Sequence, residues 1–296
     1  MKGIRALSAS VGAVALAMTL VVFMVCPVPP GQATTLADAP VLGERFVQVV
    51  AHPDDDLLFM SPDLYGAVQA GRPTATIYLT AGEGMAGLDD RHDPHQYARE
   101  RLDGLHAAYA YLAGSRDSWH STMLTAGRMR VRMDSLDDRP EIRLIFAGLP
   151  DGGDPRADGG RDALIRIWSG GACVHPFALP GPCADRSEVA GMIRALLRRF
   201  HCTTLRTLDP YPPRARIGDH PDHVASARLA DEAVGGLPIT VMAYRGYPMA
   251  SWSPNITFRM RAFKGEVFRR YRDHDYRVRY GWRYWAWLER MYRITT

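Results

Sequence analysis

Residues 46–60, FVQVVAHPDDDLLFM, decide how the rest of the chain is interpreted. The stretch begins with an apolar, β-branched run at residues 45–51, which is typical of a strand buried on both faces. The run ends in His52, Pro53 and three consecutive aspartates, and the sequence then turns apolar again. Adjacent carboxylates repel one another, and apolar neighbours raise the cost of removing them from water. The stretch therefore predicts either a positive group beside residues 54–56 or a solvated turn.

Outward from this stretch, strand-like apolar runs alternate with helical patterns along the chain. Strands are predicted at residues 45–51, 74–80, 142–150, 203–210 and 238–246, and helices at residues 63–71, 94–114, 188–200 and 220–234. This alternation predicts an α/β fold, in which a mostly parallel sheet carries helices on both faces. In such sheets ligands bind beyond the carboxyl ends of the strands, where the clusters HPDDD, TAGEG, LPDGG and GDHPDH all fall. The carboxyl rim of the sheet is therefore the predicted site.

The composition sets few limits on function. With 296 residues, of which 47% are hydrophobic, the chain can form one large α/β domain or two smaller ones. The net charge of +4 argues only weakly for a polyanionic partner, and we expect no nucleic acid partner. Nearly all of the positive charge is arginine, since Lys2 and Lys264 are the only lysines.

The first forty residues have the features of a targeting segment. Lys2 and Arg5 precede the apolar run ALSASVGAVALAMTLVVFMV, which small residues follow. This pattern predicts a secretory signal peptide within residues 1–37, cleaved near Gly31–Ala37, although the apolar run is long enough to stay as a membrane anchor. We therefore expect a secreted or extracytoplasmic protein with a single domain at residues 38–296, which contacts the membrane only if the segment is uncleaved.

Three cysteines lie beyond this segment. Cys173 and Cys183 bound the loop CVHPFALPGPC, and an oxidising compartment would favour a disulfide between them. Cys202 lies between a predicted helix and a predicted strand, and we expect a buried thiol there. The alternatives are that Cys173 and Cys183 are buried free thiols, or that they bind zinc, which the lack of a C-x-x-C pair disfavours.

Two short motifs at predicted strand ends contain residues that bind metals. HPDD supplies His52 and Asp55, and HPDH supplies His220, Asp222 and His223 at a helix start. Alone, each motif would be interpreted as a surface turn. Together, two histidines and one carboxylate form a catalytic ligand set that leaves positions open for water and substrate. We therefore predict one Zn²⁺ per chain, which would also supply the positive charge expected beside residues 54–56.

The early AHPDDD and the late GDHPDH together resemble the LmbE/PIG-L family of N-acetylglucosaminyl deacetylases. The loop YLTAGEG, the helix that contains RLDG and AAYAYLAG, and the loop LPDGG are also similar to family motifs, so that the resemblance spans about residues 46 to 245. It implies a Rossmann-like fold and zinc-dependent hydrolysis of the N-acetyl amide of a GlcNAc-type sugar or glycoconjugate, with release of acetate. The implied partner is an N-acetylated amino sugar.

The resemblance also implies roles for the residues of the two motifs. His52, Asp55 and His223 match the family's metal ligands, and Asp54 matches its general base. His220 matches the group that stabilises the oxyanion or protonates the leaving amine, and we expect its imidazole to be protonated. This division agrees with metal-assisted hydrolysis, in which a carboxylate that is not a ligand removes a proton from water.

Other positions are implied to support the substrate or the ligands. Arg101 and Asp151 match residues that hold the sugar, and we expect Asp56 and Asp222 to lie just behind the ligands. Gly218 stands where some family members have a tyrosine. Oxyanion stabilisation is therefore expected from the metal and the second motif alone, or from a residue that the sequence does not identify.

The segment from about residue 255 is rich in arginine and aromatic residues. It predicts a helix that packs its aromatic side chains on the core, although binding to a surface, to a polyanion or to carbohydrate stays open. Two other functions also stay open. One is metal-dependent hydrolysis of another N-acyl amide, and the other is carbohydrate binding by the same fold without turnover.

Overall fold

Strand β1 (Phe46–Val50) forms from the apolar run that opens the stretch 46–60, and every one of its residues is buried. Because side chains alternate along a strand, Val47 and Val49 enter the hydrophobic cluster on one face of the sheet, and Val50 enters the cluster on the other. The continuous apolar run therefore produces a central strand that is buried on both faces.

The computed structural model describes residues 43–151, 163–171, 173–213, 217–279 and 284–294. These residues belong to one compact unit, Leu42–Thr296. The predicted signal peptide, residues 1–37, lies outside the described residues. Within the described ranges, no helix is both long and apolar enough to cross a membrane.

One sheet of eight strands runs through the described residues, in the order β3-β4-β5-β2-β1-β6-β7-β8. Four strands run parallel to β1, namely β2 (Thr74–Thr80), β5 (Arg139–Leu149), β6 (Thr204–Leu208) and β7 (Thr240–Tyr244). The mostly parallel sheet predicted from the sequence is confirmed.

The connections from β1 and β6 leave the sheet toward opposite faces. The connection from β1 to β2 passes through α2 (Asp63–Gln69) on one face, and the connection from β6 to β7 passes through α6 (Pro221–Val234) on the other. Ligand sites of open α/β sheets lie in the crevice that forms at such a point. The motifs HPDDD and HPDH follow these two neighbouring strands, so both motifs border this crevice.

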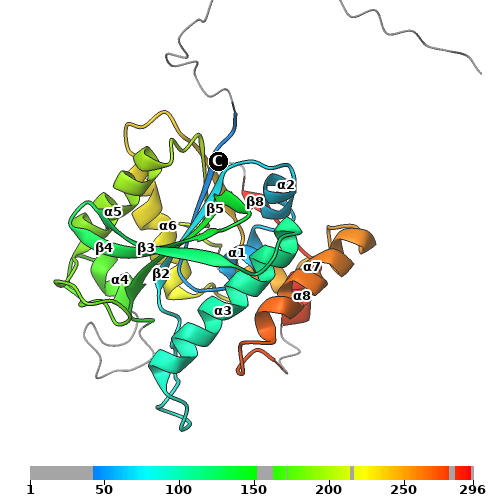
Figure 1. Ribbon diagram of the computed structural model, residues 1–296, viewed down its shortest axis with the longest axis horizontal. Coiled ribbons are helices and arrows are strands. Elements are labelled where there is room, and N and C mark those ends of the chain that lie inside the picture. The colour runs from blue at the N-terminus through cyan, green and yellow to red at the C-terminus, as the bar shows by residue number, and fades with distance from the viewer. Residues whose placement is uncertain (1–42, 152–162, 172, 214–216, 280–283, 295–296) are drawn as a thin grey trace, which may run out of the picture. The chain divides into compact units, whose positions relative to one another are not determined.

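Helices cover both faces of the sheet, as predicted (Figure 1). On one face the hydrophobic cluster contains residues of α4 (Ala163–Trp168), α5 (Arg186–Arg199) and α6. On the other face the cluster contains residues of α1 (Asp55–Phe59), α2, α3 (Pro94–Ala113), α7 (Phe258–Arg272) and α8 (Trp285–Leu288). Helix α3 begins where the Asp93 side chain accepts a hydrogen bond from the Gln96 N–H, and it ends at Gly114 with a φ of 64°.

Three features of the fold differ from the sequence prediction. The chain between α3 and β5 forms an antiparallel hairpin of β3 (Trp119–Ala126) and β4 (Met129–Leu136), which the sequence analysis does not predict. Its strands carry many exposed side chains, whereas the predicted strands came from continuous apolar runs. The HPDDD motif is also more than a turn, because its last two aspartates start α1. A short strand, β8 (Arg293–Ile294), pairs antiparallel with β7.

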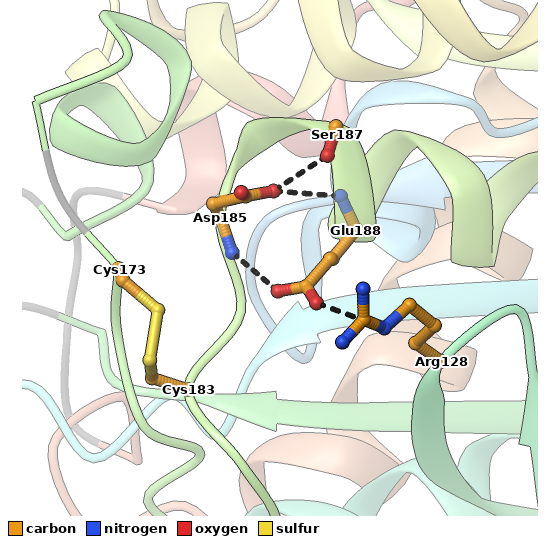
Figure 2. The surroundings of a disulfide bond; sticks show 6 residues. All are labelled: Arg128, Cys173, Cys183, Asp185, Ser187 and Glu188. Carbon is orange, nitrogen blue, oxygen red and sulfur yellow. Dashed lines mark hydrogen bonds and ion pairs between the residues drawn. A yellow bond between two sulfur atoms is a disulfide. The ribbon is translucent and has the colours of Figure 1, made fainter.

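The loop before α5 is closed by a disulfide between Cys173 and Cys183 (Figure 2). The two Cα atoms lie 5.4 Å apart, within the usual range for a disulfide. Next to the bond, Val174 and Ala184 form an isolated antiparallel bridge. Cys202 is a buried free thiol, as predicted, and burial raises its pKa to about 12.

The N-cap residue of helix α5, Asp185, lies two residues after Cys183 and forms a capping box (Figure 2). Asp185 Oδ1 accepts from the Glu188 N–H at 2.9 Å, and Glu188 Oε2 accepts from the Asp185 N–H at 3.0 Å. Arg128, in the turn between β3 and β4, lies 3.4 Å from Glu188 Oε1. The capping box therefore fixes the direction in which the chain leaves the disulfide loop.

The C-terminal segment packs on the core, which was one of the predicted alternatives. Helix α7 lies beside α3, and the aromatic and aliphatic residues on its inner face are buried (Figure 1). Lys264 is also fully buried, and its Nζ donates to the carbonyl oxygens of Leu58 at 2.6 Å, Trp287 at 2.9 Å and Arg290 at 2.8 Å. These bonds join α7 to α1 and to the segment around α8.

Candidate active site

The first motif forms a turn at the carboxyl end of β1 that is closed by a hydrogen bond within the motif. The His52 N–H donates to Asp55 Oδ2 at 2.8 Å, which closes the HPDD turn. Asp54 precedes α1 with a φ of 142°, a backbone conformation that residues other than glycine rarely adopt. Strained backbone of this kind persists where the surrounding structure fixes it, and it is common at functional sites. The turn therefore presents Asp54 and Asp55 in a fixed orientation beside His52.

The second motif lies at the start of α6. His220 is the N-cap residue, and its Nδ1 accepts from the Asp222 N–H at 3.2 Å. Asp219 lies 2.7 Å from His223 Nδ1 and accepts from the Tyr247 N–H at 3.1 Å. A carboxylate on one ring nitrogen orients a histidine and leaves the other nitrogen available to a metal. Asp219 therefore orients His223 as a ligand, a role that the sequence analysis gives to no residue although the motif GDHPDH contains it.

His52, Asp55 and His223 meet in the crevice, with ligand atoms within 4.8 Å of one another. Asp55 Oδ1 lies 3.0 Å from His223 Nε2, and Asp55 Oδ2 lies 3.4 Å from His52 Nδ1. His223 Nε2 is buried, and although it lies close to Asp55 Oδ1, the two atoms are not aligned for a hydrogen bond. Two imidazoles and a carboxylate, with one buried ring nitrogen left over, suit a divalent metal such as zinc. The residues therefore fit a metal, and a second group formed by His52, His220 and Asp222 adjoins them.

Asp54 lies beside the metal-binding residues without belonging to either group. Its Oδ1 is 3.2 Å from Arg101 Nη2. Burial raises the pKa of Asp54 to about 8, although the charge of Arg101 lowers it. A carboxyl group whose pKa lies near neutral pH is suited to accept a proton and to return it.

The surroundings of His220 bear on its protonation state. Burial, together with the charges of His52 and His223, lowers the pKa of His220 to about 3. The ring is therefore neutral near pH 7, and because Nδ1 accepts from the Asp222 N–H, its proton lies on Nε2. These surroundings favour a neutral imidazole that can donate from Nε2, whereas the protonated imidazole that the resemblance implies stays a prediction.

The two expected sugar-binding residues, Arg101 and Asp151, line the cavity of the site and also contact neighbouring protein groups, while their role toward a sugar stays a prediction. Arg101 donates from Nη1 to the Gly82 carbonyl and from Nη2 to the Pro53 carbonyl, both at 2.7 Å. A Cβ atom on Gly82 would lie 2.5 Å from Arg101 Nη1, so this approach requires glycine. Asp151 Oδ1 lies 2.9 Å from His52 Nε2. Arg101 thus holds the HPDD turn, and Asp151 orients a metal-binding histidine.

Asp56 and Asp222 lie behind the crevice. Asp56 Oδ2 accepts from the Tyr109 hydroxyl at 2.5 Å and from the Tyr78 hydroxyl at 3.0 Å. Burial raises the pKa of Asp56 to about 6, against the effect of these two hydrogen bonds. Asp222 is fully buried, with Oδ2 3.8 Å from His52 Nε2. Asp56 therefore joins α1 to the core, and the Asp222 carboxylate lies near His52 on the buried side of the site.

A cavity of about 180 Å³ opens beside the two motifs. It is lined by His52, Asp54, Tyr97, Arg101, Asp151, His220, Tyr247, Arg277, Val278 and Tyr284. Tyr247 and Tyr284, two aromatic residues of this wall, are not among the site residues predicted from the sequence. Tyr247 starts a 3₁₀ helix, η1 (Tyr247–Ser251), and its ring lies 4.8 Å from the His223 ring and stacks on Trp287 at 4.7 Å. Tyr247 comes directly after the last predicted strand, residues 238–246, and this position at a strand end is the signal that the sequence offers for it.

Comparison with known proteins identifies the family. The sequence profile of the family described as PIG-L, GlcNAc-PI de-N-acetylase, matches residues 47–234, which is more than half of the chain. The chain belongs to this family, as the resemblance of its motifs implied.

A curated protein of Nakamurella multipartita, a 1D-myo-inositol 2-acetamido-2-deoxy-alpha-D-glucopyranoside deacetylase, is 31% identical over 196 residues. The match covers 64% of this chain and 53% of that protein, so the chain spans about half the length of this relative. Among solved structures, the chain is similar to the zinc-inhibited form of a teicoplanin deacetylase, with 19% identity, 79% of this chain and 85% of that chain covered, and a TM-score of 0.49. It is also similar to the N,N'-diacetylchitobiose deacetylase from Pyrococcus horikoshii, with 15% identity, coverage of 79% and 72%, and a TM-score of 0.49. Because both scores are below 0.5, the family assignment rests on the profile match.

Proposed function

We propose that the protein is a zinc-dependent deacetylase that hydrolyses the N-acetyl amide of a GlcNAc-type sugar or glycoconjugate. One observation carries this proposal: the ligand atoms of His52, Asp55 and His223 converge within 4.8 Å beside a cavity that Asp54 also lines. Membership of the PIG-L family supports it. We propose zinc, one ion per chain, because imidazole and carboxylate are its usual catalytic ligands.

The reaction needs a group that takes a proton from water and gives one to the leaving nitrogen. A zinc ion held by the three ligands would polarise the amide carbonyl and acidify a water molecule. Asp54 accepts a proton from the attacking water as the water oxygen bonds to the carbonyl carbon. When the C–N bond breaks, Asp54 returns this proton to the nitrogen, and acetate and the free amine leave.

Two hydrogen-bond donors are placed to stabilise the oxyanion. The neutral His220 ring donates from Nε2, because its Nδ1 is engaged by the Asp222 N–H. Burial raises the pKa of Tyr247 well above its usual range, so its phenol keeps its proton and can donate. Fixed donors of this kind stabilise the negative charge that develops on the carbonyl oxygen. Tyr247 would thus take the place of the tyrosine that some family members have at the position of Gly218.

The rest of the cavity suits the ring of an amino sugar. Tyr247 and Tyr284 bring aromatic rings to its wall, against which a sugar ring can pack. Arg277, also in the wall, pairs with Asp89 and with Asp90, so two carboxylates more than offset its charge. This excess of negative charge favours an uncharged sugar over an acidic one at that part of the wall.

We also propose that the protein works outside the cytoplasm. Disulfides persist in oxidising compartments, and the bond between Cys173 and Cys183 supports such a location. The predicted signal peptide at residues 1–37 would provide the route. Contact with a membrane would then come only from an N-terminal segment that stays uncleaved.

Acetate release from a panel of N-acetylated amino sugars of increasing size tests the proposal. We expect the zinc-loaded protein to release acetate from at least one GlcNAc-type sugar, and the chelator-treated protein to release none. Hydrolysis of other N-acyl amides alone would replace the proposed substrate class. If folded protein that holds zinc cleaves none of them, deacetylation is refuted, and titration with the same sugars would then test carbohydrate binding.

A further inference from the structure

A buried carboxylate of the C-terminal segment lies directly behind the cavity. Asp275 follows α7, is fully buried, and is absent from the cavity lining. Its Oδ1 accepts from the Tyr97 hydroxyl at 2.7 Å and from the Val278 N–H at 3.2 Å, and its Oδ2 accepts from the Tyr271 hydroxyl at 2.8 Å. A buried carboxylate with this many donors is held in one orientation.

The cation that faces Asp275 is Arg101, with Nε 3.3 Å from Asp275 Oδ2. Arg101 Nε donates to the Tyr271 hydroxyl at 2.7 Å, so the same tyrosine contacts both members of the pair. On its other side, Arg101 holds the Pro53 carbonyl at 2.7 Å and lies 3.2 Å from Asp54 Oδ1. One guanidinium group therefore stands between two carboxylates, those of Asp54 and Asp275.

This arrangement restrains a flexible side chain from two sides. Without Asp275, Arg101 would lose the anion at its Nε and could move toward Asp54, the carboxylate that remains. Asp54 would then be held by a closer ion pair and turned away from the water that it must deprotonate. Because Arg101 also fixes the Pro53 carbonyl, a shift of Arg101 would disturb the strained backbone at Asp54.

We propose that Asp275 is a positioning residue of the active site, which acts through Arg101 to hold the Asp54 carboxylate in its reactive orientation. The proposal rests on the proposed function for its kinetic consequences. It also extends the site beyond the family match, which ends at residue 234. The C-terminal segment thus contributes to the reaction itself, in addition to the wall residues Val278 and Tyr284.

Kinetics of Asp275→Asn test the proposal, with Asp273→Asn as the matched control. Asp273 lies on the same segment but is exposed and pairs with Arg269. We expect Asp275→Asn to lower kcat by roughly 10- to 100-fold, the size of the loss of one interaction with a charged group, with KM changed less than about threefold and zinc content unchanged. Asp273→Asn should match the parent protein. An unchanged kcat, a change confined to KM, or loss of zinc would each overturn the proposal.

A double-mutant cycle then tests the route through Arg101. In protein that already carries Arg101→Lys, Asp275→Asn should lower kcat by less than about threefold, because the contact it removes is already weakened. Fully multiplicative losses would show that the two residues act independently. If Asp275→Asn does not fold, Tyr271→Phe removes the hydroxyl that both residues share, and it should lower kcat without raising KM.

A readout without substrate separates this proposal from the proposed function. Chemical unfolding of the zinc-free parent protein, both single variants and the double variant should show that Arg101→Lys and Asp275→Asn lower stability non-additively. Additive effects would overturn the Arg101 contact whatever the activity. If the parent protein releases no acetate, the proposed function fails, while this cycle still decides whether Asp275 holds Arg101.

Discussion

Removal of the disulfide between Cys173 and Cys183 should lower the free energy of unfolding by about 2.7 kcal/mol. The bond joins residues with a sequence separation of 10, and in the chain-entropy description a cross-link of this span restricts the unfolded chain by about that amount. For a folded unit of this size, the melting temperature should fall by about 5–8 °C. Within the native loop, the N–H groups of Phe177 and Ala178 donate to the Gly148 carbonyl at 2.7 and 3.0 Å, and these contacts do not need the bond. The native site should therefore stay intact.

The assay is thermal unfolding of the parent protein and of a variant with both Cys173→Ser and Cys183→Ser. Addition of a reductant should lower the melting temperature of the parent to that of the variant and leave the variant unchanged. At 25 °C, kcat should be the same in all four samples, because the effect lies in the unfolded chain. A melting temperature within about 1 °C of the parent would refute the entropic reasoning, and a large loss of kcat would show that the bond shapes the native site.

Four further predictions concern the site. His223→Ala should remove most of the zinc found by elemental analysis, since two ligands hold the ion poorly, and full retention would contradict the ligand assignment. Asp54→Asn should keep the zinc and lower kcat by about 10²–10⁴-fold, whereas Asp55→Asn should lose both, and equal zinc loss in the two variants would reverse their roles. Tyr247→Phe should lower kcat by roughly 10-fold or more with little change in KM if its hydroxyl stabilises the oxyanion, and an unchanged kcat would exclude that role. Glu83 lies in the TAGEG loop, where its Oε1 accepts a hydrogen bond from the Asp151 N–H. Burial raises the pKa of Glu83 from 4.5 to about 8, so the folded protein keeps a proton that the unfolded chain releases. The free energy of unfolding should thus fall by up to about 1.4 kcal/mol per pH unit as the pH rises through this window, and urea unfolding of Glu83→Gln at pH 5 and 8 should show a smaller fall than the parent.

The convergence of His52, Asp55 and His223 could be predicted from the sequence because each lies in a short motif after a strand. His52 and Asp55 are three residues apart, and their geometry depends only on where β1 ends and how the next turn is built. His223 reaches them because β6 pairs with β1, and the parallel arrangement brings both carboxyl ends to one rim. Continuous apolar runs mark such strands clearly, so the fold class could be predicted too.

The other parts of the site depend on contacts between distant residues. Arg101 and Tyr271, whose side chains are joined by a hydrogen bond, are 170 positions apart, and no local pattern shows that α7 will pack beside α3. The same holds for Asp219, whose side chain accepts a hydrogen bond from the N–H of Tyr247, 28 positions further along the chain. The hairpin of β3 and β4 is not predictable for a different reason. Many of its side chains are exposed or partly exposed, so its strands lack the continuous apolar run that marks the other strands. Pairings of this kind are set by tertiary packing and not by sequence periodicity.

The burial of Lys264 determines where amine chemistry can reach the protein. Lys2 and Lys264 are the only lysines of the chain, and three carbonyl oxygens surround the Nζ of Lys264. Burial also holds the pKa of Lys264 well below its usual value. Active esters and aldehyde crosslinkers should therefore leave Lys264 unmodified. In a chain cleaved after its leader, the new α-amine would be the one point of attachment, so that labelling or immobilisation would give a uniform product with its cavity unmodified.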